Sequence, residues 1–132
     1  MSFSIDDCLV PDWPAPPNIR ALMTTRAGGV SVPPWNTLNL GIAVGDAPDA
    51  VLENRARLRS ILPADPRWLL QVHGDRVVEA AQVIELEAAD ASHVDRPGVV
   101  CVVQTADCLP VLFTDRAGTR VAAAHAGWRG LA

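Results

Sequence analysis

The chain contains no lysine, and this absence bears first on nucleic-acid binding. All eleven basic residues are arginines, and they are dispersed along the 132 residues rather than gathered into a stripe. Fifteen acidic residues outnumber them, so the formal net charge is −4. Because a basic patch or stripe is the footprint of a nucleic-acid-binding surface, the sequence predicts no nucleic-acid partner.

Long apolar runs are also missing. No stretch approaches the roughly 20 residues that a membrane-spanning helix requires, and the acidic amino terminus lacks the apolar segment of a secretory signal. Cysteine is scarce, and three residues, an odd number, do not make a disulfide framework. We therefore expect a cytoplasmic protein that makes no membrane contact.

What is present indicates a folded domain. Hydrophobic residues make up 49% of the chain and charged residues 20%, which is typical of a globular protein. The segment 47–62 predicts a helix, with Asp46 as its amino-terminal cap and Pro63 directly after its end. We expect the helix to bury Val51, Leu58 and Leu62.

Apolar runs rich in β-branched residues predict the strands of a sheet. These runs are residues 19–25, 68–73, 77–84, 99–104, 109–113 and 121–125. Their near-continuous apolar character indicates burial on both faces. The polar segment 85–97 predicts a loop, and the stretch 28–45, with its glycines, prolines and asparagines, predicts a long loop that faces substrate.

Together these segments predict an α+β fold, in which a mixed β-sheet carries flanking helices and the helix 47–62 packs on one face. The chain stops directly after a Gly-Trp-Arg-Gly loop, where a further helix would normally cover the sheet. We therefore expect a chain that is truncated at its carboxyl terminus.

One thiol and two imidazoles lie at the ends of predicted strands. His73 ends the strand 68–73, Cys108 precedes the strand 109–113, and His125 ends the strand 121–125. Adjacent strand ends of one sheet can bring three side chains to a common point. Zinc selects imidazole and thiolate ligands, and three of them leave a fourth position open, as in catalytic sites. On spacing alone, however, such residues are more often members of the core than ligands.

Seven short motifs occur in one order along the chain: Met23-Thr-Thr-Arg26-Ala-Gly-Gly-Val-Ser31, Leu38-Asn-Leu-Gly41, Val44-Gly-Asp46, Glu53-Asn-Arg55, Gln71-Val-His-Gly74, Thr105-Ala-Asp-Cys-Leu-Pro110 and His125-Ala-Gly-Trp-Arg-Gly130. In this order they resemble the laccase-domain family, also called YfiH-like, whose members carry the names polyphenol oxidase and purine nucleoside phosphorylase. The resemblance runs from about residue 22 to the end and corresponds to the N-terminal half of a family member. We therefore expect residues 1–132 to be a single laccase-domain segment with the YfiH-like fold.

The resemblance implies an intracellular zinc enzyme that acts on purine nucleosides, by phosphorolysis and by deamination of adenosine. It implies that His73, Cys108 and His125 are the metal ligands and belong to the catalytic centre. Zinc is the implied cofactor, with copper less favoured, and purine nucleosides and phosphate are the implied partners. The preferred nucleoside and the oligomeric state stay open.

Four further residues are candidates for catalytic or substrate-binding roles. Asp107, next to the thiol, is the candidate proton shuttle, because zinc deaminases of nucleobases pair the metal with a carboxylate. Arg26 and Arg129 are candidate phosphate ligands, since a guanidinium holds phosphate oxygens in a bidentate fork. Asn39 could bind ribose or base. Each of the four also has an ordinary interpretation as a turn or surface residue.

Three other functions remain as alternatives. A copper-dependent polyphenol oxidase could use the two histidines and the cysteine as a blue-copper-like site, although multicopper oxidation needs many imidazoles and this chain has three histidines. A metal-free cysteine hydrolase would use Cys108 as nucleophile and His125 as base. A zinc-stabilised binding module would hold the metal without turnover. His93, Cys8 and Cys101 are assigned to none of these sites.

Overall fold

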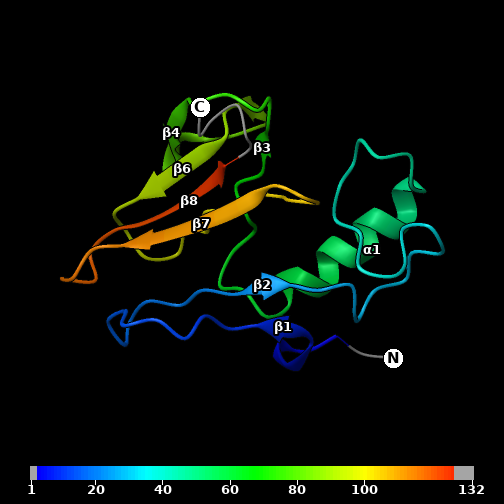
Figure 1. Ribbon diagram of the computed structural model, residues 1–132, viewed down its shortest axis with the longest axis horizontal. Coiled ribbons are helices and arrows are strands. Elements are labelled where there is room, and N and C mark those ends of the chain that lie inside the picture. Colours follow the sequence, from blue (N-terminus) through cyan, green and yellow to red (C-terminus); the bar gives the residue numbers. More distant parts are fainter. Residues whose placement is uncertain (1–2, 127–132) are drawn as a thin grey trace. The chain divides into compact units, whose positions relative to one another are not determined.

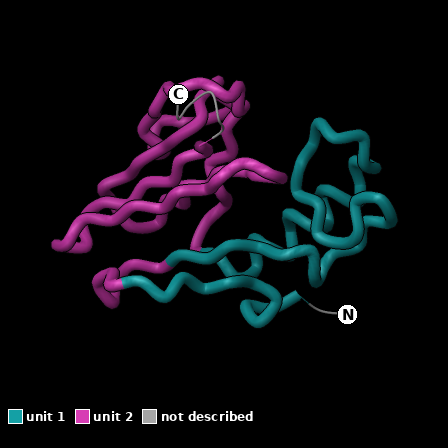
Figure 2. The backbone as a smooth tube through the Cα atoms, in the orientation of Figure 1, with its two compact units in different colours: residues 1–13, 21–62 teal, residues 14–20, 63–132 magenta. Residues whose placement is uncertain are grey.

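The computed structural model describes residues 3–126, and the chain divides into two compact units (Figure 2). The first unit comprises Met1–Trp13 and Ala21–Leu62, and the second comprises Pro14–Arg20 and Pro63–Ala132. The predicted α+β fold is confirmed, because the described residues form one α-helix and three small sheets. No helix within residues 3–126 is long and apolar enough to cross a membrane.

The first unit begins with a short two-stranded sheet. The 3₁₀ helix η1 (Ile5–Asp7) leads into β1 (Cys8–Leu9), which pairs antiparallel with β2 (Met23–Thr24), as Figure 1 shows. The predicted strand 19–25 is therefore too long. Its first residue belongs to a turn, in which the Ile19 N–H donates to the Pro16 carbonyl oxygen at 3.0 Å.

The helix α1 spans Pro48–Arg59, so the predicted helix exists but its ends were placed too far out. Ala47 is the N-cap and makes no side-chain capping bond, and the prediction that Asp46 caps the helix is wrong. The Asp46 carboxylate instead accepts hydrogen bonds from the Ser31 hydroxyl at 2.5 Å and the Asn39 amide at 3.1 Å. These bonds, the Ser31 bond first, lower the pKa of Asp46 against the opposing effect of burial.

The buried face of α1 contains Val51 and Leu58, as predicted, but its third buried residue is Asn54. Leu62 lies beyond the end of the helix and is half-buried. Asn54 is fully buried and binds the loop 28–45 with both ends of its amide. Its four partners, at 2.8 to 3.3 Å, are the Val30 N–H, the Ser31 hydroxyl and the carbonyl oxygens of Thr37 and Asn39.

The second unit contains a four-stranded sheet with the order β4-β6-β8-β7 (Figure 1). Its strands are β4 (Val77–Glu79), β6 (Ala91–Val94), β8 (Val121–Ala126) and β7 (Leu109–Thr114). The β4–β6 pair is parallel and the other two pairs are antiparallel, so the sheet is mixed, as predicted. Outside it, β3 (Leu69–Leu70) pairs parallel with β5 (Glu87–Ala88), and η2 (Ala80–Gln82) follows β4.

Three predictions about the second unit are wrong. The segment 85–97 is not a loop, because it contains β5 and the inner strand β6, whose small polar residue Ser92 is fully buried. The segment 99–104 forms no strand and contributes only an isolated bridge between Val100 and Pro66. The predicted strands 68–73 and 77–84 are too long, since β3 comprises only Leu69–Leu70 and β4 only Val77–Glu79.

The sheet buries one face rather than two. On β8, Ala123 and His125 are buried, whereas Leu109 and Phe113 of the neighbouring β7 are more than half exposed. A separate core cluster of the same unit consists of Leu69, Val78, Val83 and Ala89. Burial on both faces was therefore a wrong prediction, while the packing of α1 on the sheet stays a prediction.

Candidate metal centre

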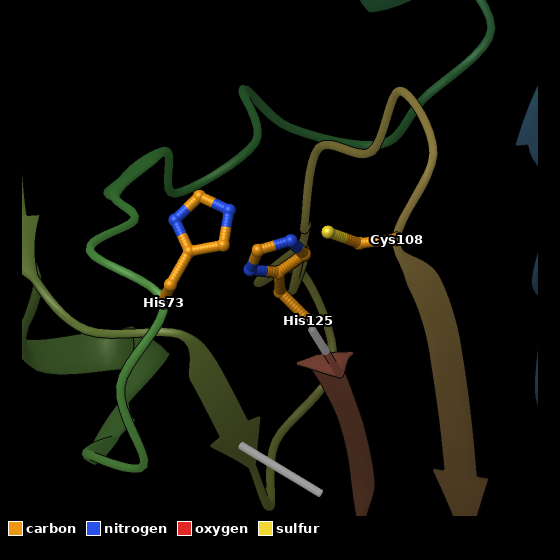
Figure 3. A group of neighbouring side chains, drawn as sticks. All are labelled: His73, Cys108 and His125. Atoms are coloured by element: carbon orange, nitrogen blue, oxygen red, sulfur yellow. The ribbon is translucent and has the colours of Figure 1, made fainter. Parts of the chain in front are cut away.

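The side chains of His73, Cys108 and His125 come together in the second unit. One potential ligand atom from each lies within 4.8 Å of the other two. Figure 3 shows the three side chains pointing toward a shared space, and the two imidazole rings meet edge to face with centroids 4.8 Å apart. Two imidazoles and one thiol therefore converge from three segments that are far apart in the sequence.

His125 is the most rigidly held of the three. It lies on β8 beside Pro110 of β7, and its side chain is buried. The Nδ1 atom of its ring is 2.7 Å from the Asp90 Oδ2 atom, and its backbone N–H donates to the Asp90 carbonyl oxygen at 2.7 Å. Because Nδ1 is engaged in this way, Nε2 is the ring nitrogen that remains for a ligand.

His73 reaches the group from a loop. It lies between β3 and β4, so the expectation that three strand ends of one sheet supply the side chains is wrong for this residue. Its φ of 60° is the only left-handed backbone angle of a non-glycine residue within the described chain. Histidine is one of the few residue types that tolerate this region, at some energetic cost. The residue is exposed.

Cys108 immediately precedes β7, as the sequence predicts, and is half-buried. Its Sγ atom is 3.8 Å from an oxygen of the exposed Asp107 carboxylate. Burial raises the pKa of the Cys108 thiol, and the negative charges of Asp107 and Asp90 raise it further. A bound cation acts in the opposite direction, because metal coordination favours the thiolate.

The residue that the sequence analysis missed is Asp90. Its side chain is buried, and its carboxylate accepts hydrogen bonds from three consecutive backbone N–H groups, those of residues 72–74, at 2.9 to 3.0 Å. Burial alone would raise the pKa of Asp90, but the bonds from His125 and from these amides outweigh it and lower the pKa. Asp90 lies inside the segment 85–97, which the sequence predicts to be a polar loop, and it belongs to none of the motifs.

Gln71 joins the segment that carries His73 to the segment that carries Cys108. The Gln71 side chain donates to the Gln104 carbonyl oxygen at 2.7 Å and accepts from the Gln104 N–H at 2.7 Å. The amide of Gln71 thus binds the other backbone as a neighbouring strand would. In the sequence, the only indication that Gln71 belongs to the site is its position two residues before His73.

The donor set of this group fits zinc. Neutral imidazole nitrogen and thiolate sulfur are the ligands of catalytic zinc sites, in which three protein side chains leave one position open. Bonds of about 2.0–2.1 Å to nitrogen and about 2.3 Å to sulfur would draw the three donor atoms closer than their present separations of up to 4.8 Å. The exposed His73 and the half-buried Cys108 have more room to adjust than the buried His125.

Two of the predicted substrate-binding residues belong to the other compact unit. Arg26 and Asn39 belong to the first unit. The exposed Arg26 donates from Nε to the Asn36 carbonyl oxygen at 3.0 Å, and the Asn39 side chain accepts from the Gly41 N–H at 3.1 Å within its own loop. Arg129 lies outside the described residues.

A pocket of about 170 Å³ opens beside His125. Its lining residues include Val77, Ala91 and Ala124, which come from three adjacent strands of the sheet, and Arg76. Ligand sites typically combine an apolar wall with a few polar groups. The pocket places such a wall next to one of the three candidate ligands.

Comparisons with known proteins agree with this architecture. Residues 20–132 match a family described as multi-copper polyphenol oxidoreductase laccase. A purine nucleoside phosphorylase of Pseudomonas aeruginosa is 62% identical over 124 residues, which cover 94% of this chain and 51% of the relative. The purine nucleoside phosphorylase YfiH of Escherichia coli is 56% identical over 126 residues, covering 93% of this chain and 52% of that protein.

A solved structure supports the same conclusion about the fold. A protein of Neisseria meningitidis matches with a TM-score of 0.90 and 54% sequence identity, over 95% of this chain and 52% of that one. A Bacillus licheniformis protein named YfiH matches with a TM-score of 0.70 and 36% identity. The predicted YfiH-like fold is therefore confirmed. The chain spans about half the length of the curated relatives that it matches.

Proposed function

The chain belongs to the family described as multi-copper polyphenol oxidoreductase laccase, and from this premise we propose that the protein is a zinc-dependent purine nucleoside phosphorylase that also deaminates adenosine. The observation that supports the proposal most directly is the group of two imidazoles and one thiol within 4.8 Å. The names of its relatives supply the phosphorylase activity. The proposal includes a cytoplasmic location and a single laccase-domain segment over residues 1–132.

His73, Cys108 and His125 would hold the metal. A zinc ion bound there would supply Lewis-acid chemistry. Copper is less favoured, because this chain has only three histidines and the third, His93, lies in β6 and outside the group. Electronic absorption during a copper titration tests this, since a thiolate–copper band that disappears in Cys108→Ala would show that Cys108 binds copper.

Phosphorolysis requires a cationic site for its second substrate. The bond between the anomeric carbon and the purine nitrogen breaks, a bond from that carbon to a phosphate oxygen forms, and a proton goes to the departing base. We assign phosphate binding to Arg26 and Arg129, whose guanidinium groups suit bidentate contacts. We assign contact with ribose or base to Asn39.

Deamination requires proton transfer instead. A water oxygen adds to C6 of adenosine, ammonia leaves, and inosine remains. The role of Asp107 is to take a proton from the water and deliver it to the leaving amine. Its exposure and its position next to Cys108 support this assignment. The pocket that His125 lines combines apolar residues with a few polar groups, as ligand sites typically do.

One observation favours a second candidate, the metal-free cysteine hydrolase. Asp90 contacts the His125 ring at 2.7 Å, and a nitrogen of that ring lies within 4.8 Å of the Cys108 thiol. An orienting acid, a base and a nucleophile are the parts of such a hydrolase. His73 has no role in such a hydrolase, yet it lies in the same group. We therefore place the hydrolase second.

The test is a turnover assay on the purified protein with its metal content measured in the same sample. We expect about one zinc per chain, release of hypoxanthine from inosine only when phosphate is present, and conversion of adenosine to inosine without phosphate. Release of free base at the same rate without phosphate would show hydrolysis and refute the phosphorylase. Full activity without bound metal would favour the cysteine hydrolase.

Two arginine variants test the assignment of phosphate binding. Arg26→Ala and Arg129→Ala should impair phosphorolysis far more than deamination, because deamination uses no phosphate. Arg116→Ala, which removes an exposed arginine from the turn between β7 and β8, is the matched control and should change neither activity. Parallel loss of both activities in folded Arg26 or Arg129 variants would contradict their assigned role.

A further inference from the structure

The Asp90 carboxylate contacts both the loop that carries His73 and the ring of His125. Oδ1 accepts from the Val72 and Gly74 N–H groups, both at 3.0 Å. Oδ2 accepts from the His73 N–H at 2.9 Å and lies 2.7 Å from His125 Nδ1. One buried side chain therefore contacts the backbone of one candidate ligand and the ring of another.

We propose that Asp90 is the positioning residue of this site, which fixes the tautomer of His125 and the loop conformation of His73 together. The inference rests on the proposed metal-binding function, but it concerns the arrangement that exists before any metal binds. Neither the comparisons nor the motifs assign a role to Asp90.

The tautomer follows from the chemistry of the pair. An ionised carboxylate can only accept hydrogen bonds, so the Nδ1 atom of His125 must carry a hydrogen. A neutral imidazole has one N–H, and Nε2 is then left with a free lone pair. Metal-binding histidines commonly donate their other ring N–H to a carboxylate in this way. Figure 3 shows the second nitrogen of the His125 ring on the side of Cys108.

The loop conformation depends on the same carboxylate. Three consecutive N–H groups of residues 72–74 point toward it, which forms an anion-binding concavity of backbone donors. This arrangement compensates for the left-handed backbone of His73, whose φ is 60°. Asp90 itself is fixed to β8, because its carbonyl oxygen accepts from the His125 N–H.

Asp90→Asn tests the proposal, since asparagine has nearly the same shape but one acceptor oxygen and one NH₂ donor. If the amide oxygen stays with Val72 and Gly74, the NH₂ group opposes the His73 N–H and faces His125, where it makes Nδ1 an acceptor and moves the ring hydrogen to Nε2. If the amide is flipped, the NH₂ group opposes the Val72 and Gly74 N–H groups and releases the loop. Either orientation removes one ligand from its position.

The first readout is the ¹⁵N spectrum of the histidine rings in the metal-free protein. In the unsubstituted protein we expect His125 to carry its hydrogen on Nδ1. In Asp90→Asn we expect either the Nε2–H tautomer or faster hydrogen exchange at residues 72–74. An Nε2–H tautomer in the unsubstituted protein would overturn the proposal, and this measurement does not depend on whether the variant folds.

The second readout is zinc affinity, measured by competition with a chromophoric chelator. Asp90→Asn should bind zinc about 10–100-fold more weakly, the usual effect of losing an outer-shell partner. Asp75→Asn removes an exposed carboxylate near the same loop and should bind as the unsubstituted protein does. An Asp90→Asn variant with the original tautomer and unchanged affinity would refute the proposal.

The two readouts also separate this proposal from the proposed function. In one outcome, the unsubstituted protein binds no zinc, its His125 has the Nδ1–H tautomer, and Asp90→Asn changes that tautomer. The metal function then fails and the positioning role of Asp90 stands. If zinc binds tightly but neither the His125 tautomer nor the hydrogen exchange of residues 72–74 responds to Asp90→Asn, the metal function stands and the positioning role fails.

Discussion

Replacement of Asn54 by alanine should destabilise the first unit more than any other single change on α1. Asn54 is fully buried and makes four hydrogen bonds to the loop 28–45, the segment that carries Asn39. Asn54→Ala removes all four bonds and adds no partner for the loop. The loop then loses its main polar attachment to the helix.

The magnitude follows from those bonds. A typical intramolecular hydrogen bond contributes about 0.5–1.5 kcal/mol net, and a buried group left without a partner costs more. Three of the bonds are 2.8 to 2.9 Å long and the fourth, to the Thr37 carbonyl oxygen, is a weaker 3.3 Å. Some of the four groups that lose Asn54 as a partner will bind water instead, which reduces the loss of stability. We therefore expect a loss of about 3 kcal/mol in the free energy of unfolding.

Urea denaturation of the purified protein measures the loss, and hydrogen exchange at residues 28–45 shows whether the loop is released. Leu52→Ala on the same helix is the control, because this side chain is 66% exposed and its loss should change stability by less than about 0.5 kcal/mol. If Asn54→Ala costs less than about 1 kcal/mol and leaves the exchange of the loop unchanged, the reasoning is wrong.

Two further predictions concern the second unit. Cys108→Ala should weaken zinc binding by more than the roughly 10–100-fold expected for an outer-shell residue, whereas Cys101→Ala, outside the group, should leave affinity unchanged in the same chelator competition. Hydrogen bonds from Thr119 lower the pKa of Asp115, so its stabilising contribution is present above the unfolded value of about 3.9 and is lost as the pH falls through the folded pKa. Urea denaturation at pH 6 and pH 3 should therefore show a smaller acid-induced loss in Asp115→Asn than in the unsubstituted protein, and an equal loss would contradict this.

The sequence predicted best those elements whose signals are local. The helix α1 and the strands β7 and β8 follow from apolar patterning and flanking turn residues, and their predicted centres are correct. β6 was missed because Ser92 and His93 make the segment polar, although its pairing with β8 buries Ser92 completely. Such burial depends on the partner strand and is invisible in the segment itself.

In the candidate site, too, the sequence indicates the residues with a local signal and does not indicate those whose role depends on distant contacts. His73, Cys108 and His125 belong to the residue types that bind zinc, so the sequence could nominate all three. Asp90 could not be nominated, because its role arises from a contact with the backbone 16 to 18 residues away and with a ring 35 residues away. The N–H of the left-handed residue His73 likewise donates to Asp90, which lies 17 residues away in the sequence.

X-ray absorption at the zinc edge of the purified protein tests the central claim most directly. We predict about two nitrogen ligands at 2.0–2.1 Å and one sulfur ligand at about 2.3 Å, and the sulfur signal should disappear in Cys108→Ala but persist in Cys101→Ala. Absence of zinc from the protein, or a zinc environment without sulfur, would contradict the assignment of His73, Cys108 and His125 as its ligands.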